Sequence, residues 1–497
     1  MAGIGFKFRK LIHEGTYTSE AKGYLFASVF AAGPWIMTMI IIGILTYLAP
    51  PKVNNDELIV FRASITYIFA FSLVIVGVFH LPLTRYLADR LFEEDLTAFF
   101  SAYLDSLLVI VVLATPAGAA FLYYNSGSVF FKLFTFFNFL VISMIWIGMV
   151  FLSAIREYKF VILTFFTGSI ASIFFSNILK NDFGLEGYIL GFFIGQFVIF
   201  TGISAELFKE FNFNKGLSFK FLAYMKKYPL LILSGVGYNL GIWMDKLVIW
   251  NSPLKESYYN NLNVYGLYDT AVFIAYLSVI PALGYFYASV ETSFYETYRM
   301  YFSSIFMKRK MKFLEEARDR IIYMVDASIL TLFKNQGVIT LLAFVWSAWI
   351  VGLFGGTETS VSIFRYALIG VLFQVLFLFC SIFMMYFEFY LELGIINLFF
   401  CISNYLGTYI VLYYTEYNLA LGYTITCFIC FILTFGILRY KLKHLIYLTF
   451  INQPIITAVD VKADFSIFDL LNDLNHTPHK ELLDSIEHKS NPVETEN

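Results

Sequence analysis

The chain has 497 residues, of which 59% are hydrophobic, 20% are aromatic and only 14% are charged. Soluble domains carry roughly 25% charged residues, so this composition excludes an ordinary soluble protein and indicates a polytopic membrane protein. The formal net charge of -2 excludes nothing by itself, and the positions of the charges along the chain are more informative.

Residues 1–22 form a basic segment in which apolar residues are interleaved with Lys7, Arg9 and Lys10. Such a segment suits a helix that lies on a cytoplasmic membrane surface. It has no small-residue cleavage site after a short apolar core, so we expect that it is not a cleaved signal.

Twelve apolar runs follow, each close to the roughly 20 residues that a helix needs to cross a bilayer. We therefore expect an all-α polytopic membrane protein with about twelve transmembrane helices in two six-helix bundles. The bundles are predicted over 23–206 and 229–450, with a basic linker over 207–228. The predicted spans are approximately 23–48, 61–83, 105–124, 129–152, 160–179, 185–205, 229–250, 268–289, 336–354, 362–387, 395–414 and 418–438.

Lysine and arginine residues are distributed very unevenly between the loops. With the N-terminus inside, 24 of those before residue 450 fall on the inner side and 3 on the outer side. This bias predicts that both ends of the chain are cytoplasmic and that the number of spans is even.

Two further segments are predicted to be cytoplasmic. The longest inner loop, 291–335, is basic and partly helical in pattern, which suits anionic lipid, a cytoplasmic partner or a simple solvated connection. The tail 451–497 is acidic: from Asp460 onward it has nine acidic residues and three lysines. Its three histidines have no supporting cysteines, so we expect no metal site there.

The run from Tyr228 to Trp250 reads YPLLILSGVGYNLGIWMDKLVIW and is the unusual span. Proline and glycine make a membrane helix easy to bend or break, and such residues also interrupt the first and eighth spans. The positions expected to bend or break helices are Pro34, Gly235, Gly237, Gly241 and Pro281.

The same span carries polar groups at helical spacing. Asn239, Trp243 and Lys246 fall on one face, with Asp245 on the neighbouring face. Amide, indole and ammonium groups suit a sugar-like cargo, whereas the alternative interpretation is an interfacial aromatic belt with snorkelling charges. Because adjacent helical residues point about 100° apart, we expect Asp245 and Lys246 to pair with other residues rather than with each other.

Four other charges border predicted spans towards the outer side and are candidates for the lining of a cavity between the bundles. Ordinary interfacial anchoring is the alternative for each. Asp269 or Arg62 is the expected partner of the Asp245–Lys246 pair, and Trp250 is expected at the membrane edge with little effect on transport. The four charges are Arg62, Lys132, Asp269 and Arg365.

The chain contains no Walker P-loop, H-E-x-x-H or G-x-S-x-G motif and no soluble stretch long enough for a catalytic domain. We therefore expect no catalytic residues, no cofactor and no bound metal, and the sequence gives no indication of nucleic-acid binding. Paired halves that each open with a bendable helix are typical of transporters built for alternating access.

Three short stretches resemble the PelG family: MAGIGFKFRKL at the start, AAGPW in the first span and YNLGIWMDKLVIW in the seventh. The resemblance implies an inner-membrane transporter subunit for Pel exopolysaccharide, of the multidrug/oligosaccharidyl-lipid/polysaccharide exporter superfamily. It also implies an amino-sugar-rich cargo, a cytoplasmic glycosyltransferase as partner, and membrane partners in a synthase complex regulated by cyclic-di-GMP. Length and span count agree over residues 1–450, and the acidic tail has no place in the family pattern.

Two rival functions stay open from the sequence alone. The first is a cation-coupled drug or lipid-linked oligosaccharide exporter of the same fold, since fold does not decide cargo. The second is a membrane-embedded sugar polymerase or acyltransferase, which would call for a large outer loop or a His/Asp pair at membrane depth. Neither of these features is visible in the sequence.

Overall fold

The structure is a computed structural model of the chain, which divides into a unit of residues 1–446 and a unit of residues 447–497. Pro34, the segment 1–21 and the tail 452–497 lie outside the described residues, so the second unit is described only over 447–451. The described residues are 22–24, 26–28, 33, 37–38, 40–45, 48, 55–93, 95–152, 158–211, 216–415 and 418–451.

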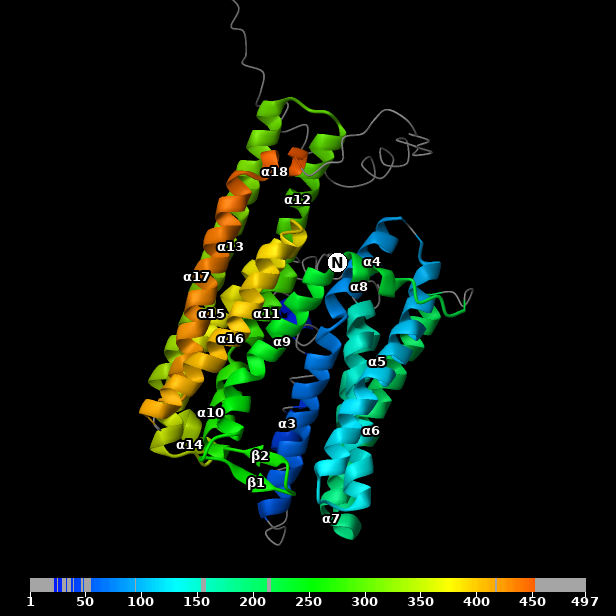
Figure 1. Cartoon of the computed structure of the whole chain (residues 1–497), viewed down its shortest axis with the longest axis vertical. Coiled ribbons are helices and arrows are strands. Elements are labelled where there is room, and N and C mark those ends of the chain that lie inside the picture. The colour runs from blue at the N-terminus through cyan, green and yellow to red at the C-terminus, as the bar shows by residue number, and fades with distance from the viewer. Residues whose placement is uncertain are drawn as a thin grey trace, which may run out of the picture. The chain divides into compact units, whose positions relative to one another are not determined.

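The first half of the chain, as described, is built from helices that pack along one another (Figure 1). Gly184 has φ 56° and divides α7 into two antiparallel-packed arms, because glycine adopts this backbone conformation without steric cost. The helices are α3 (Asn55–Gly77), α4 (His80–Phe92), α5 (Thr97–Tyr124), α6 (Val129–Leu152) and α7 (Tyr158–Glu210).

The second half, which we take as α9 to α17, follows the short linking helix α8 (Phe221–Lys227). Its elements are α9 (Pro229–Trp250), β1 (Glu256–Tyr258), β2 (Leu262–Val264), α10 (Gly266–Leu277), α11 (Ile280–Tyr285), the π-helix η1 (Phe286–Val290), α12 (Glu291–Phe306), α13 (Met311–Val345), α14 (Ser347–Leu353), α15 (Glu358–Tyr386), α16 (Tyr390–Tyr414) and α17 (Leu421–Lys443). A last helix, α18, covers Leu445–Ile451.

Within the described residues, nine helices are long and apolar enough to cross a membrane. One of them, α7, supplies two spans because it turns at Gly184. With α9, which has 22 residues, the described helices account for eleven of the predicted spans, and the residues described between 22 and 45, where the first span is predicted, are helical. The chain is an all-α polytopic membrane protein.

The predicted inner loop 291–335 is mostly helix. Helices α12 and α13 meet at a short turn that contains Lys308, Arg309 and Lys310, and α13 runs on to Val345 without a break. The ninth span is therefore the apolar end of a 35-residue helix, and α14 follows it separately. The sequence pattern predicted a span that starts later and ends later than this helix does.

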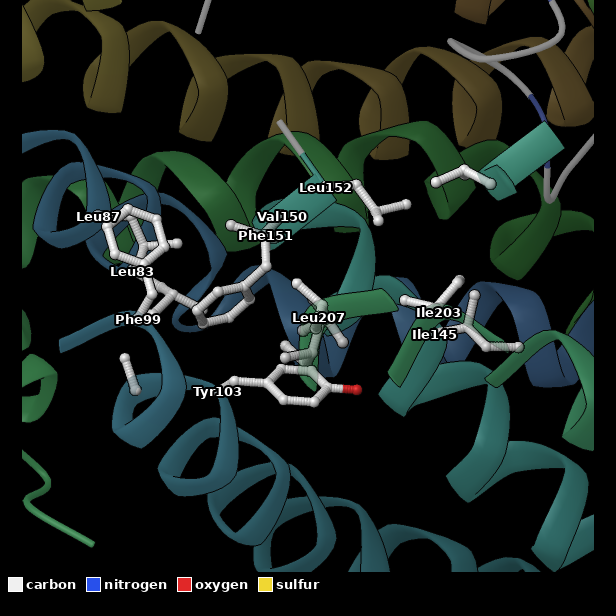
Figure 2. Packing of buried hydrophobic residues seen from close by; sticks show 14 of the residues in the cluster. Leu83, Leu87, Phe99, Tyr103, Ile145, Val150, Phe151, Leu152, Ile203 and Leu207 are labelled. Carbon is white, nitrogen blue, oxygen red and sulfur yellow. The ribbon is translucent and has the colours of Figure 1, made fainter. Parts of the chain in front are cut away.

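Aromatic and branched side chains fill the interior of the first half, as Figure 2 shows. Tyr103 of α5 meets Phe151 of α6 edge to face, with ring centroids 5.3 Å apart. The Tyr103 hydroxyl also bonds the Ser204 hydroxyl of α7 at 2.8 Å, so this buried polar atom has a partner. Phe221 of α8 belongs to the same core, which attaches the linking helix to the first half.

A glycine row in α7 allows its two arms to pack tightly. Side chains added at Gly187, Gly191 or Gly195 would collide with the backbone or with Ser172 of the opposite arm. Small residues at fourfold spacing let a neighbouring helix approach closely. Here the neighbour is the preceding arm of the same helix pair.

The glycines of α9 have a different role from the predicted one. Helix α9 is continuous from Pro229 to Trp250, so Gly235, Gly237 and Gly241 do not break it. Gly235 lies against the Gly77 carbonyl of α3, and the other two lie against the backbone and Phe400 of α16. The absence of side chains at these glycines lets α3 and α16 approach α9 closely on different sides.

Pro281 lies at the start of a new helix. Helix α10 ends at Leu277, and Pro281 occupies the first turn of α11, where its missing N–H is not needed. The π-helix η1 follows at once. The eighth span is therefore irregular between α10 and α12.

The hairpin β1–β2 connects the second half to one end of the first. The backbone N–H of Asn263 in the hairpin donates to the Tyr67 hydroxyl of α3 at 3.1 Å. The same hydroxyl donates to the backbone carbonyl of Asn263 at 2.9 Å. Asn125 donates to Asn261 at 2.7 Å, and Leu262 is fully buried in a core cluster of the first half. We call this end of the helices the hairpin end.

We predict that Gly235→Ala lowers the free energy of unfolding by about 1–3 kcal/mol, because a methyl group there meets a backbone oxygen that cannot move aside. The measurement is the thermal unfolding of purified protein in detergent. Gly436→Ala is the matched control, since nothing lies within 4 Å of a Cβ at that exposed position. Equal melting temperatures for the two variants would contradict the close approach of α3 and α9.

Candidate functional site

Helix α9 is in contact with both halves of the chain. It packs on α16 within the second half and on α3 of the first half. Asn239 lies against Gly77 of α3 and donates to the Gly235 carbonyl at 2.9 Å. The face of α9 that carries Asn239 is thus the face turned towards the first half.

An aromatic row continues along this face. Trp243 and Trp250 have ring centroids 6.5 Å apart, and Tyr67 of α3 stacks on Trp250 at 4.6 Å with an interplanar angle of 14°. Trp243 is half-buried, whereas Trp250 is 1% exposed. Aromatic surface from both halves therefore meets where α3 and α9 pack together.

The expectation that Asp245 and Lys246 pair with other residues rather than with each other is wrong. The Lys246 Nζ lies 3.2 Å from Asp245 Oδ2 and 3.3 Å from Oδ1, and both side chains are buried. The lysine chain is long and flexible enough to fold back over the preceding residue despite the 100° between their Cα–Cβ directions. Burial favours this arrangement, because a buried charge without a partner is costly.

Three aromatic residues complete the surroundings of the pair. The Tyr268 hydroxyl of α10 donates to Asp245 Oδ2 at 2.6 Å. The Lys246 ammonium lies 5.3 Å from the ring centres of both Trp243 and Tyr276. Cations bind the faces of aromatic rings with about 0.5–2 kcal/mol each, more when water is excluded. The charged pair therefore has a hydrogen-bond donor on one side and two rings on the other.

Hydroxyl groups extend this network from α10 to α15 and α17 of the second half. Tyr423 of α17 bonds the Tyr276 hydroxyl at 3.2 Å and also the side-chain oxygen of Gln374 on α15. Tyr268, Tyr276, Tyr423 and Gln374 were not identified from the sequence. Only Tyr268 had a local signal, its position beside Asp269. Tyr276 lies on the same helix without such a signal, and Tyr423 and Gln374 come from distant helices.

Asp269 is not the partner of the charged pair. Its carboxylate accepts hydrogen bonds from the Trp250 indole at 3.0 and 3.1 Å and from the Tyr265 amide at 3.0 Å. It also interacts electrostatically with Lys246 and Asp245, so the three charges form one group. Trp250 is correspondingly a buried structural residue at the last position of α9 rather than a side chain exposed to the membrane surface.

The structure does not bring the other three predicted charges to this group. Arg62 is exposed, and its Nε contacts the Leu58 carbonyl of its own helix at 3.4 Å. Lys132 is half-buried on α6. Arg365 donates to Ser347 of α14 at 2.7 Å and covers the Phe344 ring at 5.2 Å. None of these described contacts involves the Asp245–Lys246 pair, which supports local anchoring for these charges.

A metal ion has no evident place in the described part of the chain. No three or more His, Cys, Asp or Glu side chains come together there in a way that could hold one. The four cysteines are free and buried. The chemistry available around α9 is therefore hydrogen bonding, ring stacking and a buried ammonium–carboxylate pair.

Comparison with known families places these observations in context. A family model described as "PelG: Putative exopolysaccharide Exporter (EPS-E)" matches residues 1–450. The comparison with curated proteins finds no match.

Solved transporters of the MATE family and MOP superfamily share the fold. An outward-facing multidrug resistance MATE transporter has a TM-score of 0.61 at 13% identity, covering 85% of this chain and 94% of that one. An inward-facing one has a TM-score of 0.60 at 14% identity, covering 90% and 99%. A MOP superfamily transporter from Pyrococcus furiosus, described by the reverse polarity of its binding pocket, has a TM-score of 0.59 at 14% identity, covering 85% and 95%.

We predict that Trp250→Ala destabilises the protein by about 3–5 kcal/mol, because it removes a buried ring stacked on Tyr67 and the indole donor of Asp269. The measurement is the thermal unfolding and membrane level of the variant. Trp250→Phe, which retains an aromatic ring but has no N–H, should lie between wild type and Trp250→Ala. A Trp250→Ala protein as stable as wild type would argue against the structural role.

Proposed function

Because the chain belongs to the PelG family of exopolysaccharide exporters, we propose that it is the transporter subunit that moves a Pel-like, amino-sugar-rich polysaccharide across the bacterial cytoplasmic membrane for the biofilm matrix. Family and fold indicate a membrane transporter rather than an enzyme. The pathway in this proposal runs between the two halves, along the face of α9 that carries Asn239 and Trp243.

The single observation that carries the proposal is the combination of groups on this face. Trp243 is half-buried on the same face of α9 as Asn239, and its ring is already in contact with the Lys246 ammonium. A flat indole stacks on sugar rings, and the amide of Asn239 can bond hydroxyl groups. Several weak contacts in a row suit a chain that must keep moving better than one tight site does.

The charged pair gives the proposed lining a second property. An ammonium held by a carboxylate and two rings can exchange one of these contacts for a passing hydroxyl or carbonyl group without becoming unpaired. Asp245 keeps its bond from Tyr268 during such an exchange. A polar chain could thus pass at low cost through a membrane-embedded site.

The rival exporters of the same fold differ in their expected cargo. A drug or lipid-linked oligosaccharide has an apolar part, for which a mostly apolar pocket is suitable. The face of α9 instead offers indole, amide and ammonium groups within three helical turns. This composition favours a hydrophilic sugar chain over an amphipathic molecule.

The proposal includes an orientation and partners. Both termini are cytoplasmic, which follows from the 24-to-3 distribution of lysine and arginine. A cytoplasmic glycosyltransferase would supply the chain, and membrane proteins of a cyclic-di-GMP-regulated synthase complex would lie beside the transporter. The basic turn between α12 and α13, with Lys308, Arg309 and Lys310, is the proposed contact for the glycosyltransferase.

We predict that removing both charges, with Asp245→Asn and Lys246→Gln together, leaves a folded protein at normal level but lowers polymer export by about tenfold, equivalent to about 1.4 kcal/mol. Each single change would leave the other charge buried and unpaired, at a cost of about 3–5 kcal/mol, so only the double variant separates function from stability. Cell-surface polymer and membrane protein level are measured together.

Trp243→Ala is the companion variant and should give the same loss of export. Trp349→Ala is its matched control, since that tryptophan is 66% exposed on α14. Normal export by the double variant and by Trp243→Ala would leave interfacial anchoring as the role of these residues and would refute the proposed pathway.

We predict that charge reversal of Lys308, Arg309, Lys310 and Lys312 to glutamate weakens co-purification of the cytoplasmic glycosyltransferase, because the turn between α12 and α13 then repels acidic surfaces. Reversal of Lys441 and Lys443 at the end of α17 is the control for a general loss of positive charge. If the partner is recovered as well as with wild type, the docking assignment is incorrect.

A further inference from the structure

At the end of the helices opposite the hairpin, the two halves are joined by a cluster of charged and aromatic residues. Arg85 of α4 belongs to the first half, and Glu388 lies in the short connection between α15 and α16 in the second. The Arg85 Nη1 and the Glu388 carboxylate are 2.5 Å apart. Since 303 positions separate these residues in the chain, the ion pair is a direct link between the halves.

Neighbouring groups hold Arg85 in position. Its guanidinium donates to the Tyr390 hydroxyl at 3.3 Å and lies 5.9 Å from the centre of the Tyr228 ring. Asp89, one turn along α4, forms an ion pair with it, and its Oδ1 lies 3.2 Å from the Arg85 Nε. Burial alone lowers the pKa of Arg85, but Tyr390, Glu388 and Asp89 together raise it above its ordinary value.

The backbone at Glu388 is in a conformation that non-glycine residues rarely adopt. Its φ is 60°, in the left-handed region. Such strain persists where the surrounding structure determines the conformation, and it is found at switch regions and ligand contacts. Only Phe387, Glu388 and Phe389 separate α15 from α16, so a change of φ at Glu388 would reorient the carboxylate and the start of α16.

The hairpin end is closed by different contacts between the same halves. There, Asn261 and Asn263 of the hairpin bond Asn125 and Tyr67 of the first half. A polymer that moves between the halves must pass both of these ends. Contacts that join the halves at either end therefore have to open during transport.

We propose that the Arg85–Glu388 ion pair is a latch. It closes the pathway at the end opposite the hairpin and opens when the two halves separate there. This inference depends on the proposed transport function. The side chains of the pair are 27% and 50% exposed, so water can replace either partner when the pair opens. An ion pair that is partly exposed to water contributes little net stability, which suits a contact that must break in every cycle.

The test measures opening directly in purified protein, independently of export. Leu81 of α4 lies against Gly235 of α9, behind the latch. We would introduce Leu81→Cys into a variant whose four native cysteines are replaced by alanine, and measure labelling by a hydrophilic maleimide. Arg85→Glu and Glu388→Arg should each speed labelling by about fivefold, the factor that corresponds to about 1 kcal/mol for an exposed pair. The double exchange, Arg85→Glu with Glu388→Arg, should restore slow labelling.

A closely matched control exists on the same helix. Glu93 pairs with Arg90 within the first half, and its exposure of 49% nearly equals that of Glu388. Glu93→Arg makes the same chemical change without touching the link between the halves, and it should leave labelling unchanged. Equal labelling of the Glu93 and Glu388 variants, or no recovery in the double exchange, would overturn the latch.

Export of polymer by the same variants separates the latch from the proposed function. The single charge reversals should reduce export at normal protein level, and the double exchange should restore it. Faster labelling with unchanged export would show that the contact does not control the pathway, which also overturns the proposal. A protein whose wild type exports no polymer, yet whose labelling follows the pattern above, would contradict the proposed cargo while leaving the latch in place.

Discussion

The burial of two opposite charges at membrane depth is the constraint on which the arrangement around α9 depends. Both charges of the Asp245–Lys246 pair are buried, so each is neutralised by groups of the second half. The carboxylate takes Tyr268 as a donor, and the ammonium takes the faces of Trp243 and Tyr276. The aromatic residues that surround the pathway proposed here are thus the same residues that make the buried pair tolerable.

The two sides of α9 are packed in different ways, and this difference determines which contacts are able to change. On the α16 side, Gly237 and Gly241 let the backbones touch, and Asn397 and Asn404 donate across the interface. On the α3 side, Gly77 meets Gly235 and Asn239, and Tyr67 stacks on Trp250. Helix α9 is therefore part of the second half, and its contact with the first half is the one that can be exchanged.

The sequence was sufficient to predict the parts of the structure that depend on hydropathy and periodicity. Length and apolar character predict the spans, and a period of 3.6 residues places Asn239 and Trp243 on one face of α9, the face that packs against α3. The role of Gly235 could not be predicted, because a glycine that bends a helix and a glycine that admits a neighbour look alike in one dimension. The neighbour, Gly77, lies 158 positions away.

Side-chain pairing was predicted less well for a related reason. The expectation that Asp245 and Lys246 point apart considers only the Cα–Cβ directions, whereas the lysine has four further rotatable bonds and is driven to the nearest carboxylate by burial. Likewise, Trp250 follows a charged pair at the end of an apolar run, which is typical of an interfacial residue. It packs against Tyr67 and bonds Asp269 of α10, and neither contact leaves a local pattern in the sequence.

The two principal ion pairs of the chain have opposite properties, and together they suggest how a polar pathway can be both stable and movable. Asp245 and Lys246 are adjacent on one helix and fully enclosed, so no motion of one half against the other can separate them. Arg85 and Glu388 lie on different halves and are partly in contact with water, so their separation costs little. A permanent charge pair can therefore line the path while exchangeable charges hold one of its ends. An enclosed pair at the end would prevent opening, because breaking a buried ion pair costs about 3–5 kcal/mol. An exposed pair in the middle would require water throughout the membrane-embedded part of the path.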